Sequence, residues 1–373
     1  MLIAEPGRGK LKRFFRSWLV PVHRWIALTF GIILVGTAVT GACIVFRPQL
    51  ELMLNQSLLT AAACQQRLPI DDLAQAAAKI RPQATLDYVR INQTPLNDGA
   101  RVPAVAIRFT DQEFVYLDGC TGEVLGQRHR YGGLLGTVEQ LHRWRFIENG
   151  SLITGTTAIL AAIVLGLGGL VMAIVLRTKP SLLVFRAGLS GTARTLDIHK
   201  TIGLYVSLFI VGMAITGLPQ AYDWYRKGIY TVMGSEMPKA PPKLEVPTGV
   251  QRQTYESLWQ TGSSLVPGFS EALMHLPSDP RQPVDMYAIP AGAPHANART
   301  LLWFDPYSGR TLKHIPYEQS SLGFKVYFWT LSLHSGKVGG WPVQLLMLIG
   351  ALMIPVLFVT GLMAYLRRTR RPL

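Results

Sequence analysis

The chain has 373 residues, of which 49% are hydrophobic and 16% are charged. It is more apolar than most soluble domains, and the excess is concentrated in four long runs, which excludes an ordinary soluble protein. The formal net charge of +15 is what a nucleic-acid-binding protein could carry, but the basic residues gather beside the apolar runs and therefore indicate membrane topology instead.

The four apolar runs lie near residues 18–46, 152–176, 201–219 and 341–366. Each is roughly 20 residues long, enough for a helix to cross a hydrocarbon core of about 30 Å. The first run is too long for a signal peptide, and Phe46-Arg47-Pro48 does not resemble a small-residue cleavage site. The sequence therefore predicts an α-helical bundle of four spans in a lipid bilayer.

Basic clusters determine the predicted orientation, because positively charged residues near helix ends stay in the cytoplasm. We expect both termini in the cytoplasm of a bacterial cell and the long connections in the periplasm, with the protein in the inner membrane. The clusters precede the first span, separate the second from the third, and follow the fourth: Arg8, Lys10, Lys12, Arg13 and Arg16; Arg177, Lys179, Arg186 and Arg194; Arg367, Arg368, Arg370 and Arg371.

The predicted organisation alternates membrane spans with extramembrane segments. In chain order it comprises a basic N-terminus (1–17), the first span (18–46), periplasmic domain 1 (47–140), the second span with a periplasmic extension (141–176), a cytoplasmic loop (177–197), the third span (198–220), periplasmic domain 2 (221–330), the fourth span with a periplasmic extension (331–366) and a basic tail (367–373).

Each periplasmic segment has the pattern of a small α+β unit. In the first, residues 70–80 form a capped amphipathic helix and 114–126 a hairpin with an Asp-x-x-x-Gly turn. In the second, 254–260 is a weaker helix and 301–312 a hairpin of the same form. Cys64 and Cys120 share the first segment, where an oxidising environment permits pairing, and the sequence leaves that disulfide open.

The two halves of the chain resemble each other, which predicts a tandem repeat. His23 and His199 each begin an outward span and precede a Thr-Gly pair by the same interval of 17 positions. His142 and His334 each follow a leucine and precede a Gly-Leu pair at equal spacing. We expect parallel repeats related by an axis along the membrane normal.

Topology sorts these four histidines into two pairs. His23 and His199 fall near the cytoplasmic surface, and His142 and His334 near the periplasmic surface, with each pair facing across the bundle. Neutral imidazole is the usual axial ligand of b-type haem, so the pattern predicts two bis-histidine haems. A lone histidine would be interfacial, and two histidines without a carboxylate or cysteine make a poor site for a bare metal. No CxxCH motif for covalent haem attachment occurs.

The His-Arg-Trp start of the first span, the Thr-Gly pairs, the Leu-His motifs and the Asp-x-x-x-Gly hairpins resemble the PepSY-associated transmembrane family. The resemblance covers nearly the whole chain and is closest to the FoxB-type siderophore reductases of the inner membrane. It implies four helices, paired periplasmic PepSY-like domains and haem. It further implies reduction of ferric iron held by an imported siderophore, by outer-sphere electron transfer without a general acid or base.

Substrate and donor are less specified by the sequence. Aromatic and basic residues near the periplasmic histidines are candidates for contacting a ferric siderophore, although an interfacial aromatic belt is the alternative; they are Trp144, Arg145, Lys325, Tyr327 and Trp329. No dinucleotide-binding or P-loop motif occurs, and the cytoplasmic segments are short. Electrons would therefore come from a separate flavin reductase, reduced flavin or quinol.

Other functions remain open at this point. A siderophore or haem permease or binding subunit would use its histidines transiently. A PepSY-type sensor would have a protein partner and no redox activity. A di-haem protein could also reduce another periplasmic redox protein in place of a ferric siderophore.

Overall fold

The computed structural model describes residues 6–94, 96, 100–175 and 184–369. The basic residues Arg177, Lys179, Arg370 and Arg371 lie outside this part of the chain. The chain divides into two compact units. The bundle unit comprises Met1–Phe46, Thr137–Gly228 and Leu333–Leu373, and the sheet unit comprises Arg47–Gly136 and Ile229–Ser332.

The bundle unit contains four helical segments long and apolar enough to cross a membrane, as predicted: Arg16–Ile44, Gly150–Ala173, Gly191–Ala221 and Gly340–Arg368. The first, third and fourth belong to single helices, α1 (Pro6–Ile44), α8 (Gly191–Ala221) and α12 (Gly340–Thr369). The second comprises α6 (Gly150–Leu160), the π-helix η1 (Ala161–Leu167) and α7 (Gly168–Val175). The prediction of a multi-pass membrane protein with four spans is confirmed.

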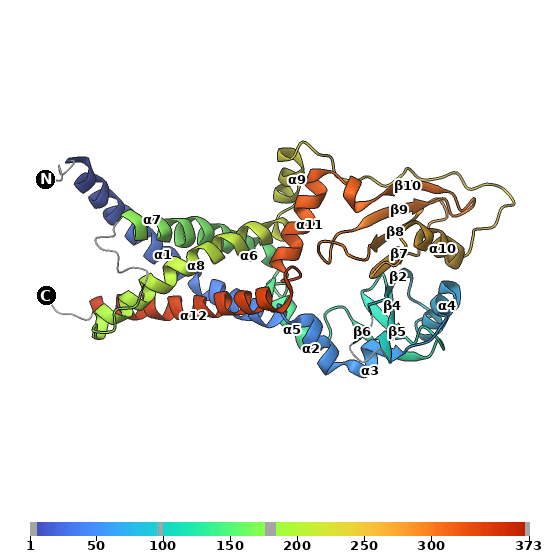
Figure 1. Ribbon diagram of the computed structural model, residues 1–373, viewed down its shortest axis with the longest axis horizontal. Coiled ribbons are helices and arrows are strands. Elements are labelled where there is room, and N and C mark those ends of the chain that lie inside the picture. The colour runs from blue at the N-terminus through green and yellow to red at the C-terminus, as the bar shows by residue number, and fades with distance from the viewer. Residues whose placement is uncertain (1–5, 95, 97–99, 176–183, 370–373) are drawn as a thin grey trace. The chain divides into compact units, whose positions relative to one another are not determined.

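The four spans form a ring, seen side by side in Figure 1. Helix α12 packs on both α1 and α8, and the α6–α7 segment also packs on both, so α1 and α8 lie diagonally opposite. Small and branched side chains from all four spans meet in the centre: Ala38, Ala161, Val206, Ile210 and Ile354. Large apolar side chains such as Ile32, Leu208 and Leu346 point outward, as expected of helices in lipid.

Three further helices contain the points at which the chain passes between the units: α5 (Gly133–His142), α9 (Asp223–Val232) and α11 (Leu322–His334). Helices α5 and α11 each end at a histidine, and a short connection then leads into the next span. The chain therefore places His142 and His334 immediately before the second and fourth spans.

The sheet unit is built on one antiparallel sheet of eight strands in the order β10-β9-β8-β7-β2-β4-β5-β6. The strands are β2 (Leu86–Asn92), β4 (Val105–Phe109), β5 (Glu113–Leu117), β6 (Val124–His129), β7 (Glu271–His275), β8 (Val284–Ile289), β9 (Thr300–Phe304) and β10 (Thr311–Ile315). Smaller elements complete the unit: α2 (Arg47–Leu54), α3 (Gln56–Leu59), the β1 (Thr60–Ala62) and β3 (Arg101–Pro103) pair, and the 3₁₀-helix η3 (Tyr317–Gln319).

The two predicted α+β regions each contribute four strands to this sheet. Both predicted hairpins form, as β5–β6 and β9–β10. The regions do not have separate sheets, however, because β2 pairs with β7 from Tyr88↔His275 to Asn92↔Glu271. This pairing satisfies the backbone groups that two isolated edge strands would leave exposed.

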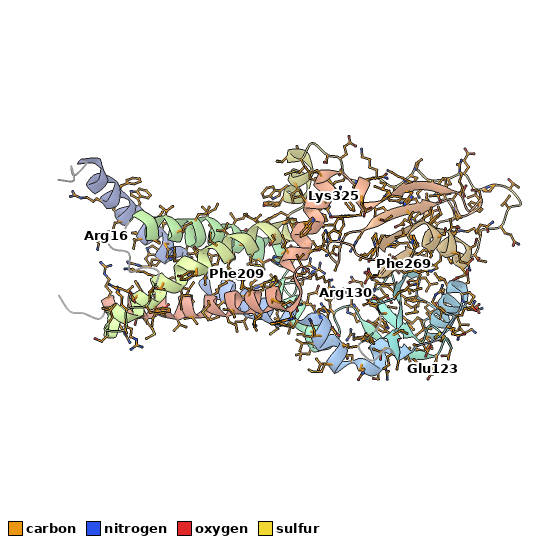
Figure 2. The ribbon with its side chains drawn as sticks, in the orientation of Figure 1. Arg16, Glu123, Arg130, Phe209, Phe269 and Lys325 are labelled. Carbon is orange, nitrogen blue, oxygen red and sulfur yellow. A yellow bond between two sulfur atoms is a disulfide. The ribbon has the colours of Figure 1, made fainter. Side chains whose placement is uncertain are left out.

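Helices α4 (Ile70–Ile80) and α10 (Tyr255–Leu265) cover one face of the sheet around a core that includes Leu73, Val89, Leu258 and Met274. Phe269, labelled in Figure 2, packs edge-to-face on Trp259 of α10, with 5.6 Å between ring centroids. The sequence predicts α4 with its exact bounds.

The two helices cap each other. The Asp71 carboxylate accepts hydrogen bonds from the backbone N–H groups of Tyr255 and Glu256, at 3.0 and 2.9 Å. The Glu256 carboxylate in turn accepts one from the Ile70 N–H at 2.9 Å and pairs with Arg67 at 2.9 Å. The cap predicted for α4 therefore comes from the other half of the chain. Carboxylates also suit the positive end of each helix dipole.

The structure joins Cys64 and Cys120 in a disulfide that closes a loop with a sequence separation of 56. Cys43, in α1, is a free thiol.

Candidate functional site

One pair of histidines faces across the bundle from the two diagonal helices. His23 on α1 and His199 on α8 have ring centroids 6.4 Å apart and ring planes at 86°. The Nδ1 atom of His23 lies 3.3 Å from the Val164 carbonyl oxygen, and that of His199 lies 3.1 Å from the Leu357 carbonyl oxygen. Each ring is thus anchored to a neighbouring span.

The second pair has the same spacing. His142 and His334, at the ends of α5 and α11, have ring centroids 6.4 Å apart and planes at 47°. His142 Nδ1 lies 2.9 Å from the Thr37 carbonyl oxygen of α1. His334 Nδ1 lies 3.3 Å from Thr216 Oγ1 of α8 and also bonds the Met213 backbone. The structure therefore brings together the same two pairs that topology predicts.

The hydrogen bonds determine which nitrogen of each ring is available. A carbonyl oxygen can only accept, so the Nδ1 atom beside it must carry the proton. The Nε2 atom then keeps its lone pair, which is the form of imidazole that ligates a metal. Among the described residues, no hydrogen bond occupies Nε2 of these four histidines.

A glycine faces each of the four rings. A Cβ atom on Gly217 would lie 2.6 Å from Cε1 of His334, and a Cβ on Gly41 or Gly361 would lie 3.1 Å from Cε1 of His142 or His199. At His23 the contact is looser, with 3.8 Å from a Cβ on Gly169. The absence of a side chain at these helical positions lets each ring lie close to the backbone of a neighbouring span.

The His23/His199 pair opens on a cavity of about 690 Å³ within the bundle. Its inner wall is apolar and includes Leu34, Leu165 and Ile354. Five cationic side chains also line it: Arg24, Arg186, Lys200, Arg367 and Arg368. One of them, Arg186, is paired with Asp197 at 2.7 Å. A ligand that is largely apolar and carries anionic groups would match this lining.

The two pairs lie near opposite ends of the bundle. His142 packs beside Thr40 and Gly41, which follow His23 by 17 and 18 positions on α1, an axial rise of about 26 Å. The apolar cluster around Ala161, Val206 and Ile354 fills the centre of the bundle.

These features fit haem ligated by two imidazoles at each end. A metal held at about 2 Å from one nitrogen of each ring would separate the two ring centroids by roughly the observed 6.4 Å. Each pair offers two neutral nitrogen donors and no carboxylate. Among the described residues, no group of three or more His, Cys, Asp or Glu side chains forms an alternative metal site.

The predicted substrate-contacting residues fall in different units. Trp144 and Arg145 lie in the bundle unit after α5, where Trp144 adopts a left-handed φ of 52° and its ring lies 5.4 Å from Phe146. The other three lie on α11 in the sheet unit, where Lys325 is labelled in Figure 2. Lys325 donates to the Glu318 carbonyl oxygen at 2.6 Å, and the Trp329 ring lies 4.7 Å from His295. Tyr327 packs on Phe328, with centroids 5.0 Å apart.

The sheet face opposite α4 and α10 was not predicted as a functional surface. Arginines stack on aromatic rings there, since Arg90 lies 5.9 Å from the Phe114 ring centre and Arg299 lies 4.2 Å from that of Tyr287. The Tyr287 hydroxyl donates to Glu271 at 3.1 Å, and burial raises the pKa of Tyr287 to about 12, so it stays neutral. Arg299 Nε is buried without a hydrogen-bond partner among the described residues.

The sheet unit also contains a buried polar cluster that was not predicted from the sequence. His295 bonds Tyr317 through Nε2 at 3.0 Å and Ser332 through Nδ1 at 2.9 Å, and Asn297 donates to Ser332 at 2.8 Å. Burial lowers the pKa of His295, which keeps the ring neutral. The cluster fastens α11 to the loop before β9. No sequence signal distinguishes this histidine from a surface one.

The fold and these sites define a multi-pass membrane protein that holds two facing imidazole pairs in a four-span bundle and carries an antiparallel sheet unit. The family model for the PepSY-associated TM region matches residues 20–368. The chain belongs to this family. No curated protein matches the chain.

Proposed function

We propose that this protein is a di-haem transmembrane electron-transfer protein that reduces periplasmic ferric siderophore and so releases Fe(II) during iron uptake. The observation that carries the proposal is the presence of two facing imidazole pairs, each with 6.4 Å between ring centroids, near opposite ends of one membrane bundle. A single pair would bind a cofactor, whereas two pairs about 26 Å apart provide positions on both sides of an apolar barrier.

The residues of the chain bind and orient the cofactor. His23, His199, His142 and His334 would hold two haems through Nε2, with Nδ1 protonated and anchored to backbone or hydroxyl oxygen. Haem bound in this way supplies one-electron redox chemistry. The apolar walls of the bundle exclude water, and cationic side chains at the cavity beside His23 and His199 would pair with the haem carboxylates.

The proposed orientation places the sheet unit in the periplasm of a bacterial inner membrane and both termini in the cytoplasm. The disulfide of the sheet unit supports an oxidising compartment for that unit. The arginines at the end of α12, Arg367 and Arg368, support a cytoplasmic position for the other end of the bundle. The electron donor would be a flavin reductase, reduced flavin or quinol that acts at the His23/His199 end.

The substrate step transfers one electron to each ferric ion and breaks no covalent bond. Fe(III) becomes Fe(II), which is less charged and is held less tightly by the hard oxygen ligands of a siderophore. The arginine–aromatic face around Arg90, Tyr287 and Arg299 offers cation and ring contacts to an anionic chelate. The candidates Lys325, Tyr327 and Trp329 would add aromatic and basic contacts within the sheet unit, whereas the candidates Trp144 and Arg145 belong to the bundle unit.

The proposal is tested by haem content and by iron reduction on the same preparation. The full chain, purified in mild detergent, should contain two b-type haems by pyridine haemochrome. His199→Ala and His334→Ala should each retain one, and His314→Ala, an exposed histidine of the sheet unit, should retain both. With dithionite as the reductant, the wild-type protein should then reduce a ferric siderophore, measured with a coloured Fe(II) chelator. If the protein purified from cells with an ample haem supply contains no haem, the proposal is refuted and a permease or sensor is favoured.

A further inference from the structure

Three of the four imidazoles contact a threonine hydroxyl as well as a glycine. In each case the threonine immediately precedes the glycine that faces the ring, so one Thr-Gly pair makes both contacts. The distances from Oγ1 to Nδ1 are 3.3 Å for Thr40 and His142, 3.3 Å for Thr216 and His334, and 3.1 Å for Thr360 and His199.

The direction of these hydrogen bonds follows from the backbone. Each hydroxyl has an acceptor for its own proton one helical turn back, at 2.7 Å for Thr40 to Gly36 O, 2.8 Å for Thr216 to Gly212 O and 2.7 Å for Thr360 to Val356 O. The hydroxyl oxygen is then left as an acceptor toward the ring, and Nδ1–H is the donor. The imidazole proton is therefore shared between a hydroxyl and a nearby carbonyl oxygen.

The same register recurs at the three sites. The carbonyl that accepts from Nδ1 belongs to the residue three positions before the threonine, namely Thr37, Met213 and Leu357. Each threonine also donates to that same carbonyl, at 3.0, 3.3 and 3.1 Å respectively. Hydroxyl, carbonyl and glycine thus form one rigid pocket for the edge of the ring.

The fourth site is built differently. The residue before Gly169 is Gly168, so His23 has no hydroxyl partner at this position. Its Nδ1 bonds the carbonyl of Val164, four positions before Gly168 instead of three. That carbonyl belongs to η1, the π-helix at Ala161–Leu167, whose wider turn shifts the backbone by one residue. The π-helix therefore takes over the anchoring of the ring.

We propose that Thr40, Thr216 and Thr360 are positioning residues that fix the rotation of His142, His334 and His199 and strengthen their donation to iron. The proposal rests on the proposed haem ligation. An imidazole whose Nδ1–H is hydrogen-bonded has a more basic Nε2. A more basic ligand stabilises Fe(III) relative to Fe(II) and lowers the reduction potential.

The proposal makes the two haem sites unequal. The His142/His334 pair has two hydroxyl partners, whereas the His23/His199 pair has one hydroxyl and one π-helical carbonyl. Removing one hydroxyl should therefore change one potential and leave the other unchanged. That selectivity separates an effect on the ligand from a general effect on the bundle.

The test is a potentiometric titration of the purified full chain, followed at the haem absorption band, together with haem stoichiometry. Thr216→Val should shift only the potential of the His142/His334 site toward positive values, and Thr360→Val only that of the His23/His199 site. Where a variant also weakens ligation, the affinity for the haem at that one site is expected to fall roughly tenfold to hundredfold. Thr216→Ser keeps the hydroxyl and should restore the wild-type value.

Thr29→Val is the matched control, because Thr29 makes the same one-turn bond, 2.8 Å to the Trp25 carbonyl oxygen, on an exposed face of α1. It should change neither potential. Two haems with wild-type potentials in Thr216→Val and Thr360→Val would overturn the positioning role and leave the proposed function standing. Wild-type protein without haem would overturn both.

Discussion

The glycines that face the imidazoles allow a graded test of how tightly each ring is held. Gly217→Ala would place a Cβ 2.6 Å from Cε1 and 3.0 Å from Nδ1 of His334. Carbon atoms in contact normally lie about 3.5–4.0 Å apart, so the ring must move by about 1 Å. Gly169→Ala is the matched control, because its Cβ would lie at an ordinary 3.8 Å from His23.

A movement of about 1 Å is large for a metal ligand, because ligation distances hold to about 0.2 Å. Gly217→Ala should therefore lower haem content from two to about one per chain by pyridine haemochrome. Gly41→Ala and Gly361→Ala, with contacts at 3.1 Å, should show partial loss. Gly169→Ala should keep both haems.

Helix stability cannot produce this order. Alanine is favoured over glycine in a helix interior by roughly 0.5–1 kcal/mol at all four positions, so intrinsic helix propensity would change the four variants alike. Circular dichroism of the same preparations should therefore show unchanged helical content in all four. Gly217→Ala with two haems at wild-type potentials, or Gly169→Ala with one, would refute the close packing of the rings.

Three further predictions concern the sheet unit. Glu256→Ala removes the cap of α4 and a charge-assisted bond, about 2 kcal/mol, and should lower the unfolding temperature by roughly 4–8 °C in a thermal scan. Arg299→Gln should raise the KM for an anionic ferric chelate about fivefold, or about 1 kcal/mol, and leave that for a neutral chelate unchanged in steady-state reduction assays. Burial lowers the pKa of His275, but Asp285, at 2.8 Å, outweighs it and raises the pKa above the usual value. The ion pair therefore contributes its full stabilisation of the folded state below about pH 6.5, and this contribution decreases as the pH rises through the raised pKa of His275. The loss of unfolding free energy caused by Asp285→Asn should accordingly shrink between about pH 5.5 and pH 8.5.

The spans and local elements of the fold could be predicted because they depend on short-range patterns. Apolar length determines a span, and the 3.6-residue periodicity of residues 70–80 determines α4. The β2–β7 pairing could not be predicted, since it joins strands separated by more than 170 positions and depends on which edges are left free. The caps exchanged by Asp71 and Glu256 depend on that same pairing.

Pairing of the histidines followed from topology and repeat spacing alone. The roles of Thr40, Thr216 and Thr360 could not be predicted, although the Thr-Gly pairs at 40 and 216 are part of the predicted repeat. A threonine in an apolar span normally bonds its own helix, as Thr29 does, and sequence cannot distinguish that case from one that also contacts a ring. The sequence AAIVLGL likewise gives no indication that these residues form a π-helix.

The helices that supply the imidazoles at one end of the bundle supply the facing glycines at the other end. At one end, α1 and α8 supply the imidazoles His23 and His199, and the second and fourth spans supply the facing glycines. At the other end, α5 and α11 supply the imidazoles, and α1 and α8 supply the glycines. An iron held between two rings, as proposed, would need them to approach from opposite sides, and α1 and α8, which carry His23 and His199, lie diagonally opposite in the bundle. A rotation of either helix would therefore disturb a ligand at one end and a glycine pocket at the other, so the two sites share one packing constraint.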